Sequence, residues 1–207
     1  MEKYIYIMLS STGTNFAKLI RLFGQQTYNH AAVSLDGNFE RTYAFARPRH
    51  SSVFLGHLVR ESLERYTLRK AEPVPVMILK IPVSEEEYAW VRQKIMQMLD
   101  NPEYMYNLFS VLTWPLLKGF PVDRAYTCIE FVAKLLQHCG YLQEGASCHY
   151  RPDDLAEQLS QYIVYEGDVR GCMSGAYIDD EYFSHITAPL LYENVKSLLA
   201  LIVRTAA

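Results

Sequence analysis

The sequence lacks the patterns of metal-binding, membrane-spanning and nucleic-acid-binding proteins. Its four cysteines show no Cys-x-x-Cys spacing, so we predict no metal site, no disulfide framework and no bound cofactor. The longest apolar run, from Leu198 to Val203, is far too short to cross a bilayer, so no transmembrane segment is predicted. No run of Lys or Arg stands out at a net charge of -3, and nucleic acid is not an expected partner.

Internal repeats and low-complexity tracts are also absent, and the 207 residues fit one domain, or one domain with an extension. Half of the residues are hydrophobic, which is enough for a full core, and 16 Tyr and 9 Phe favour a fold rich in sheet. The segment from Met1 to Leu9 reads as a first strand, because no small-residue cleavage site follows it as in a signal peptide. We therefore expect a cytoplasmic protein with reduced thiols.

Short apolar or β-rich runs predict five strands, and helical spacing with end signals predicts five helices. The strands are expected at residues 4–9, 28–35, 39–46, 74–83 and 162–166, and the helices at 15–23, 84–99, 128–139, 152–159 and 189–204. The dipeptide Asp36-Gly37 between the second and third strands is a strong hairpin signal. Residues 101–121 are expected to be irregular, because Pro115 and Pro121 break any long element.

Cys128 is the strongest candidate for chemistry. Thr127 and Glu130 fit a capping box, which makes Cys128 the first residue of its helix and gives Glu130 a structural role. The positive end of the helix dipole favours a thiolate at that position, so the sulfur is suited to act as a nucleophile. The alternative is a small apolar Cys buried in the core, which is the usual state of a free cysteine.

A thiolate nucleophile needs a base that also protonates the leaving group, and His is the usual choice. His30 opens the sequence His-Ala-Ala-Val-Ser-Leu, where the small Ala31 and Ala32 would let a helix lie close. His138 is on the Cys128 helix itself, but about 15 Å along its axis, which is too far to serve. We therefore pair His30 with Cys128. The alternative for His30 is a residue at a strand edge that is bonded to a backbone carbonyl.

The order of these motifs resembles a known group. His30 stands on the first strand of a hairpin, and the capped Cys128 helix follows almost a hundred residues later. This order is similar to the circularly permuted branch of the NlpC-type papain-like superfamily. The closest likeness is to the YiiX/YaeF-like amidases, whose relatives include lecithin:retinol acyltransferase-like proteins. Residues 29–34 and 128–132 carry the resemblance, with Ile129 where the group more often has Ser, and it covers about residues 1–168.

The resemblance implies an α+β fold of the papain-like (NlpC-type), circularly permuted kind, in which an antiparallel sheet packs on helices. Residues 1–168 would form the catalytic domain, and residues 169–207 a C-terminal extension that ends in an amphipathic helix. In the implied mechanism, Cys128 attacks a carbonyl carbon, His30 carries the proton, and an acyl thioester forms. The Cys128 amide would supply one oxyanion donor, with Tyr28 or an amide of residues 10–14 as candidates for the second.

The residue that orients His30 stays open at this level. Such enzymes place a polar residue on the strand paired with the His strand. A two-residue turn would bring Tyr43 opposite His30, whereas a three-residue loop would bring Glu40 or Thr42 to face it. The sequence favours none of these three residues over the others.

The carboxylates of Glu61 and Glu64 are expected on a solvated face, because they lie among charged residues in Arg-Glu-Ser-Leu-Glu-Arg. The last predicted helix has apolar residues on one side, at Leu191, Val195, Leu198, Leu199 and Ile202. We expect this helix to pack on the same domain. A homodimer contact or a contact with a membrane surface is the alternative.

The predicted function is a cysteine hydrolase of the amidase or peptidase type. Its substrate would be a peptide or small amide, such as one derived from the cell wall. The aromatic segment 104–114 and the apolar last helix favour one alternative, a lipid acyltransferase or thioesterase on the same fold. The unassigned orienting residue and the extra tail favour another, a catalytically inactive binding domain.

Overall fold

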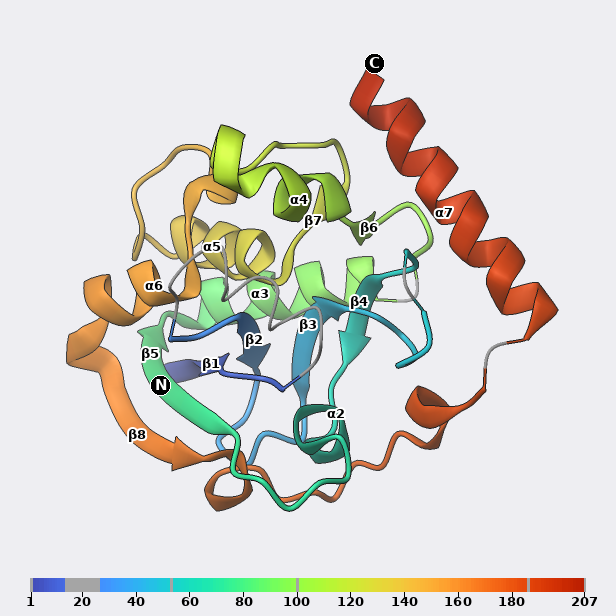
Figure 1. Cartoon of the computed structure of the whole chain (residues 1–207). Coiled ribbons are helices and arrows are strands. Elements are labelled where there is room, and N and C mark those ends of the chain that lie inside the picture. Colours follow the sequence, from blue (N-terminus) through green and yellow to red (C-terminus); the bar gives the residue numbers. More distant parts are fainter. Residues whose placement is uncertain (1, 14–26, 53, 100, 186, 207) are drawn as a thin grey trace.

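The computed structural model describes residues 2–13, 27–52, 54–99, 101–185 and 187–206, which fold into an α+β arrangement (Figure 1). Its main sheet has six strands in the order β4-β3-β2-β1-β5-β8, and every neighbouring pair is antiparallel. These strands are β1 (Lys3–Ser10), β2 (His30–Ser34), β3 (Thr42–Ala46), β4 (His57–Arg60), β5 (Pro75–Val83) and β8 (Ile163–Asp168). Two short strands, β6 (Met105–Tyr106) and β7 (Ala125–Tyr126), form a separate parallel pair.

Helices cover both faces of the sheet. One face packs on α3 (Glu85–Met98) and α5 (Cys128–His138), and their apolar sides form the larger core cluster with alternate strand residues such as Ala31 and Val33. The other face carries Ala32 and packs on α2 (Leu63–Thr67) and the segment that follows β8. Successive side chains of β2 point to opposite faces of the sheet, so each residue of the strand belongs to one of the two cores. The remaining helices are α4 (Leu108–Leu117), α6 (Pro152–Gln158) and α7 (Ala188–Ala206).

Both predicted capping boxes are present. Ser84 and Glu87 cap α3, and Thr127 and Glu130 cap α5, in each case with both reciprocal hydrogen bonds. Cys128 is thus the first residue of α5, as predicted. The helix predicted at residues 15–23 lies outside the described residues.

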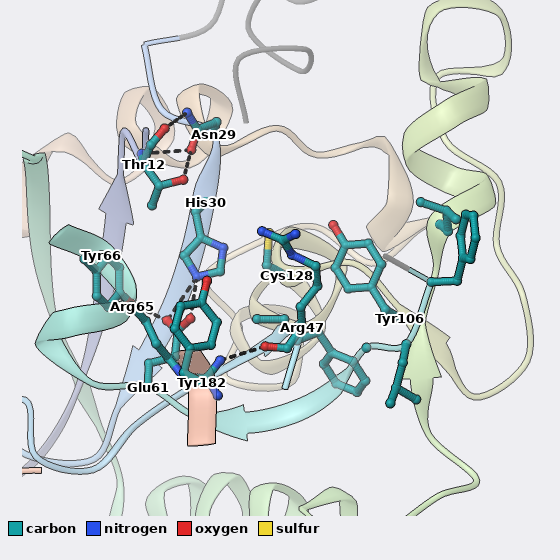
Figure 2. Close-up of a pocket in the computed structure, with 16 residues that line it drawn as sticks. Thr12, Asn29, His30, Arg47, Glu61, Arg65, Tyr66, Tyr106, Cys128 and Tyr182 are labelled. Carbon is teal, nitrogen blue, oxygen red and sulfur yellow. Dashed lines mark hydrogen bonds and ion pairs between the residues drawn. The ribbon is translucent and has the colours of Figure 1, made fainter. Parts of the chain in front are cut away.

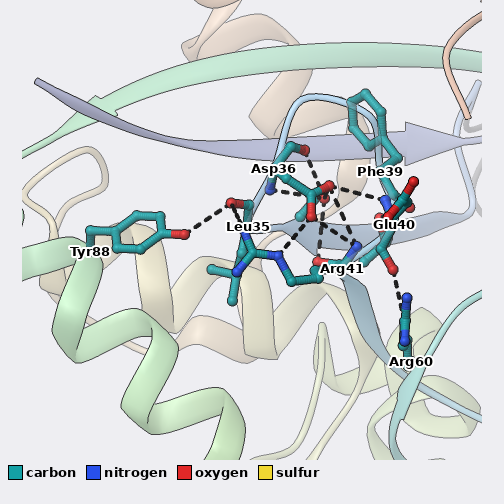
Figure 3. A network of polar contacts seen from close by, with 9 residues as sticks. Leu35, Asp36, Phe39, Glu40, Arg41, Arg60 and Tyr88 are labelled. Atoms are coloured by element: carbon teal, nitrogen blue, oxygen red, sulfur yellow. Dashed lines mark hydrogen bonds and ion pairs between the residues drawn. The ribbon is translucent and has the colours of Figure 1, made fainter.

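The hairpin predicted around Asp36-Gly37 is present, but its loop is longer than the two or three residues considered from the sequence. Strand β2 ends at Ser34 and β3 begins at Thr42, with Val33 opposite Tyr43, so a wide loop joins them. The Asp36 carboxylate holds this loop by accepting hydrogen bonds from the Glu40 and Arg41 amides and from the Arg41 guanidinium (Figure 3). The Asp36 side chain therefore sets the width of the loop, and the Asp-Gly dipeptide pattern does not describe its contacts.

Two further elements differ from the prediction. Residues 101–121 are not irregular, because the Asn107 side chain accepts a hydrogen bond from the Ser110 amide and caps α4. The strand predicted at 162–166 is the edge strand β8, whose side chains are half-buried or exposed rather than part of the core.

Helix α7 packs on the domain through another side than predicted. Leu190, Asn194 and Leu201 are buried, and Leu201 contacts the cluster that contains Met105. The predicted apolar side is largely exposed instead, at Leu191, Val195, Leu199 and Ile202. Within the described ranges, we find no helix with the length and apolar character that crossing a membrane requires.

Candidate active site

Cys128 and His30 line the same cavity, which has a volume of about 180 Å³ (Figure 2). Cys128 is brought there by the capped start of α5, and its side chain remains 7% exposed. His30 is the first residue of β2, and its imidazole faces the same cavity as the Cys128 side chain. The two residues paired from the sequence therefore meet, although 97 positions separate them (128 − 30 − 1).

Glu61 orients the imidazole of His30. Its two carboxylate oxygens lie 3.0 and 3.1 Å from His30 Nε2. The Tyr66 hydroxyl donates a hydrogen bond to the same carboxylate, and the Tyr66 ring packs edge-on against the imidazole at 5.9 Å between centroids. Because Nε2 is bound to Glu61, Nδ1 is the ring nitrogen left to exchange a proton with Cys128.

The buried setting of this pair favours its charged form. Burial alone would lower the pKa of His30, but the charges of Glu61 and Cys128 and hydrogen bonds to both raise it well above its usual 6.5. Burial alone would likewise raise the pKa of Glu61, but the charge of His30 and hydrogen bonds from His30 and Tyr66 lower it. An imidazolium held by a carboxylate is therefore the stable state near neutral pH.

Glu61 is the residue that the sequence interpretation missed. It was expected on a solvated face, yet it is only 3% exposed. Its amide bonds to the Thr42 carbonyl and continues the pairing of β4 with β3. The run His-Leu-Val-Arg at 57–60, which precedes Glu61, is the signal of a short strand that could have found it.

The three residues proposed from the sequence as orienters serve other contacts. Tyr43 stands opposite Val33, because the wide loop shifts the register by three positions from that of a two-residue turn. The Thr42 hydroxyl donates to the Phe39 carbonyl. The Glu40 backbone accepts a hydrogen bond from Arg60, and its amide donates to Asp36.

Among the sequence candidates for a second oxyanion donor, the amides of Tyr28, Ser11 and Thr12 have other partners, and Thr14 lies outside the described residues. The Tyr28 amide donates to Asp153, and the Thr12 amide donates to the Asn29 side chain. Tyr106 lines the cavity in their place. Burial raises the pKa of its hydroxyl well above 10, and the charge of Cys128 raises it further, so this hydroxyl keeps its proton and can donate.

The rest of the cavity wall combines apolar and cationic side chains. The apolar lining includes Phe45, Phe54, Leu55 and Leu108, and the cations are Arg47 and Arg65. Leu108 and Tyr106 belong to the aromatic and apolar segment 104–114 that the sequence offered as a pocket wall.

The C-terminal segment 169–207 also takes part. Tyr182 lines the cavity, and Asp179 pairs with the buried Arg65 at 2.7 Å. The Asn194 side chain of α7 accepts hydrogen bonds from the Phe54 and Leu55 amides, both at 3.1 Å. One wall of the cavity is therefore held by α7.

The other three cysteines have different surroundings. Burial raises the pKa of Cys139 to about 12 and that of Cys172 to about 11, and it raises the pKa of Cys148 as well. These three thiols are therefore protonated at neutral pH. Among the described residues, no group of three or more His, Cys, Asp or Glu side chains is placed to hold a metal ion.

Comparisons with known proteins identify no relative. No protein-family model, no curated protein and no solved structure matches this chain.

Proposed function

We propose that the chain is a cysteine hydrolase of the amidase or peptidase type, built on a circularly permuted NlpC-type papain-like frame. One observation carries the proposal. A thiol at the start of a capped helix and an imidazole held by a buried carboxylate line one cavity. A nucleophile, a base and an orienter in contact are the parts that covalent acyl transfer requires.

The reaction starts from the charged pair, in which the thiol proton of Cys128 already resides on His30 Nδ1. The thiolate attacks the carbonyl carbon of a bound amide, and the carbonyl oxygen becomes an oxyanion. His30 then gives its proton to the leaving amine as the carbon–nitrogen bond breaks, which leaves an acyl thioester on Cys128. Water attacks the thioester and transfers a proton to His30. The acid leaves, the thiolate is released, and the proton stays on His30, which restores the charged pair.

Two donors are available for the oxyanion. The amide of Cys128 has no intrahelical partner, because it belongs to the first turn of α5. The protonated Tyr106 hydroxyl is the second donor that we propose, since it lines the cavity under the influence of Cys128. Both donors are in position before a substrate binds, so the oxyanion is stabilised with little rearrangement of the protein.

The test is the pH dependence of alkylation of Cys128 by iodoacetamide, followed by intact mass and peptide mapping. We expect the wild type to react at pH 6, with Cys139 and Cys172 unlabelled. The His30→Ala variant should react far more slowly at that pH, whereas His138→Ala, which lies at the other end of α5, should match the wild type. Equal rates in His30→Ala and the wild type would contradict the proposed pair.

Turnover is the second part of this test. Small peptide amides, including peptides of the kind found in cell walls, are incubated with the wild type and with Cys128→Ala as the blank. Release of the amine by the wild type alone supports an amidase. The absence of turnover for all amides, with a normally reactive Cys128, would favour a binding domain on the same frame.

A lipid acyl substrate is the second candidate, and the apolar lining by Phe45, Phe54, Leu55 and Leu108 favours it. Activated acyl esters of increasing chain length, followed by intact mass, distinguish the two. A Cys128 acyl adduct that forms with long-chain esters, without turnover of amides, would support a thioesterase or acyltransferase. If long-chain esters leave no adduct while peptide amides are cleaved, the lipid candidate is excluded.

We also propose a cytoplasmic location and a homodimer through α7. The four free cysteines suit a reducing compartment. Leu191, Val195, Leu199 and Ile202 form an exposed apolar stripe at helical spacing, which a second copy of the chain can cover. Sedimentation of the wild type and of Leu199→Glu tests the dimer, and a wild type that sediments as a monomer at high concentration rules it out.

A further inference from the structure

Arg47 lines the cavity, and the proposed mechanism gives it no role. It follows directly after β3, and its carbonyl is fixed by a hydrogen bond of 2.7 Å from Arg65 Nη1. Its own guanidinium donates one hydrogen bond of 3.1 Å to the His50 carbonyl. Figure 2 shows the side chain of Arg47 among the cavity residues, with Cys128 and Tyr106.

The charge of Arg47 is not balanced within the cavity. Glu61 is paired with His30, and Arg65 is paired with Asp179. In the part of the chain that the structure describes, no carboxylate lies within ion-pair distance of Arg47, and its other N–H groups form no hydrogen bond. A guanidinium carries five donors in a planar fork that matches a carboxylate, so most of its binding capacity is unused.

The guanidinium also acts on the same hydroxyl as the nucleophile. Burial raises the pKa of Tyr106 most, the charge of Cys128 adds to that shift, and the charge of Arg47 opposes it. Arg47, Cys128 and Tyr106 all line the cavity, and the charges of the first two both influence the Tyr106 hydroxyl. A molecule with its carbonyl at Cys128 would bring its nearby atoms within reach of Arg47.

We propose that Arg47 binds a carboxylate of the substrate beside the carbonyl that Cys128 attacks. The substrate is then an amide of an acid that carries a second, free carboxylate a few bonds from the scissile carbonyl. One guanidinium matches one negative charge, and the cavity of about 180 Å³ has room for a short acyl group of this kind. This inference rests on the proposed function, because it takes Cys128 as the nucleophile.

The test compares alkylation of Cys128 by iodoacetate and by iodoacetamide, which have the same size but differ in charge. Each rate is divided by the rate of the same reagent with glutathione, which removes intrinsic reactivity. We expect the wild type to prefer iodoacetate and to show saturation with it. In Arg47→Gln the preference should fall by about tenfold or more, the scale of a charge-assisted hydrogen bond, with the iodoacetamide rate unchanged.

Two variants control this result. Arg92→Gln removes a charge from the exposed surface of α3 and should keep the wild-type preference. Arg47→Lys keeps a cation and should retain part of the preference for iodoacetate. A preference that is unchanged in Arg47→Gln overturns the inference. An equal loss of both rates also overturns it, because Arg47 would then act on the sulfur rather than on a carboxylate.

Protection of the wild type provides a measurement that needs no variant. Acetate should slow alkylation by iodoacetamide, whereas acetamide at the same concentration and ionic strength should not. Equal protection by both would overturn the inference and leave the proposed function intact. A Cys128 that reacts with neither reagent would instead contradict the proposed function, and the carboxylate site with it.

Discussion

The carboxylate of Glu61 receives two donors from different elements, His30 from β2 and Tyr66 from α2. Both partners are largely buried, so water has little access to either contact. A buried carboxylate with two donors fixes the tautomer and the plane of the imidazole. The reactivity of Cys128 therefore depends on a residue that touches His30 rather than the sulfur.

The Glu61→Gln substitution tests this dependence. The charge of Glu61 raises the pKa of His30, so its removal should lower that pKa and favour a neutral imidazole. We expect Cys128 alkylation at pH 6 to slow, and kcat/KM for a cleaved amide to fall by about a hundredfold or more. Glu64→Gln, three positions away on α2 and half-buried, is the matched control and should change neither rate. Equal losses in both variants would contradict the role of Glu61 in orienting His30.

The same pair predicts a pH window for stability. The folded-state pKa of His30 is raised, so its contribution is complete below the unfolded value of about 6.5 and is lost as pH rises through the folded value. The folded-state pKa of Glu61 is lowered, so its contribution is complete above about 4.5 and is lost as pH falls through the folded value. Urea unfolding should therefore show the largest gap between wild type and Glu61→Gln from about pH 4.5 to 6.5. A gap independent of pH contradicts this reading.

At the scale of single residues, the sequence predicted Cys128 and His30, because both have strong local signals. Cys128 is identified by its cap, and His30 by its place before two alanines. Glu61 could not be identified in the same way, because a charged residue between Arg60 and Ser62 is typical of an exposed segment. Its burial follows from partners on other elements.

The two capping boxes allow an internal comparison at the scale of elements. Both have the same residue types, but Ser84 caps an exposed turn, whereas Thr127 and Glu130 are buried. Glu130 also accepts hydrogen bonds from Ser110 and Asn107, so the start of α5 is tied to α4. The position of Cys128 is thus fixed by more than its own helix.

We expect Thr127→Ala and Ser84→Ala each to lower the free energy of unfolding by about 1 kcal/mol, the usual cost of a lost cap. Only Thr127→Ala should also slow the alkylation of Cys128, because the first turn of α5 carries the sulfur. Chemical denaturation and iodoacetamide kinetics measure the two effects separately. An alkylation rate that falls equally in both variants would point to general destabilisation.

Helices and strands could be predicted where their sequence signal lies within a few neighbouring residues. Capping boxes join residues three positions apart, and both were correct. The register of β2 against β3 was not predictable, since it depends on how the Asp36 side chain holds its loop. Strand β4 is only four residues long, so its local signal is weak, and its position depends on its pairing with β3.

For the molecule as a whole, the C-terminal segment 169–207 is part of the candidate site. Asp179 and Tyr182 both contact Arg65, the first through an ion pair and the second through its ring at 4.3 Å. Asn194 holds the backbone of Phe54 and Leu55. The sequence could not indicate this, because the resemblance ends at about residue 168 and the contacts cross more than 100 positions.

Two acidic residues of this segment should differ sharply in their effect on stability. Asp179 pairs with Arg65 where both side chains are at most 10% exposed, and Asp179→Ala leaves a buried cation unpaired. We expect a loss of about 3 to 5 kcal/mol. Glu181 pairs with Arg49 but is 80% exposed, and Glu181→Ala should change stability by less than about 1 kcal/mol.

Thermal and urea unfolding of the two variants provide the comparison. Asp179→Ala should in addition raise KM for a cleaved amide, because Arg65, which packs on the Tyr182 ring in the cavity wall, loses its ion-pair partner. Similar stabilities for Asp179→Ala and Glu181→Ala would mean that the C-terminal segment is not anchored by the ion pair.

The cavity is lined by residues from Thr12 to Tyr182, and this has a consequence for biosynthesis. Cys128 leaves the ribosome before Tyr182, at a stage when the cavity still lacks one wall. Pairings between residues so far apart in the chain form late, since loop closure must be completed first. A nascent chain therefore carries its thiol without a finished pocket, and the cavity is complete only after translation has passed this region.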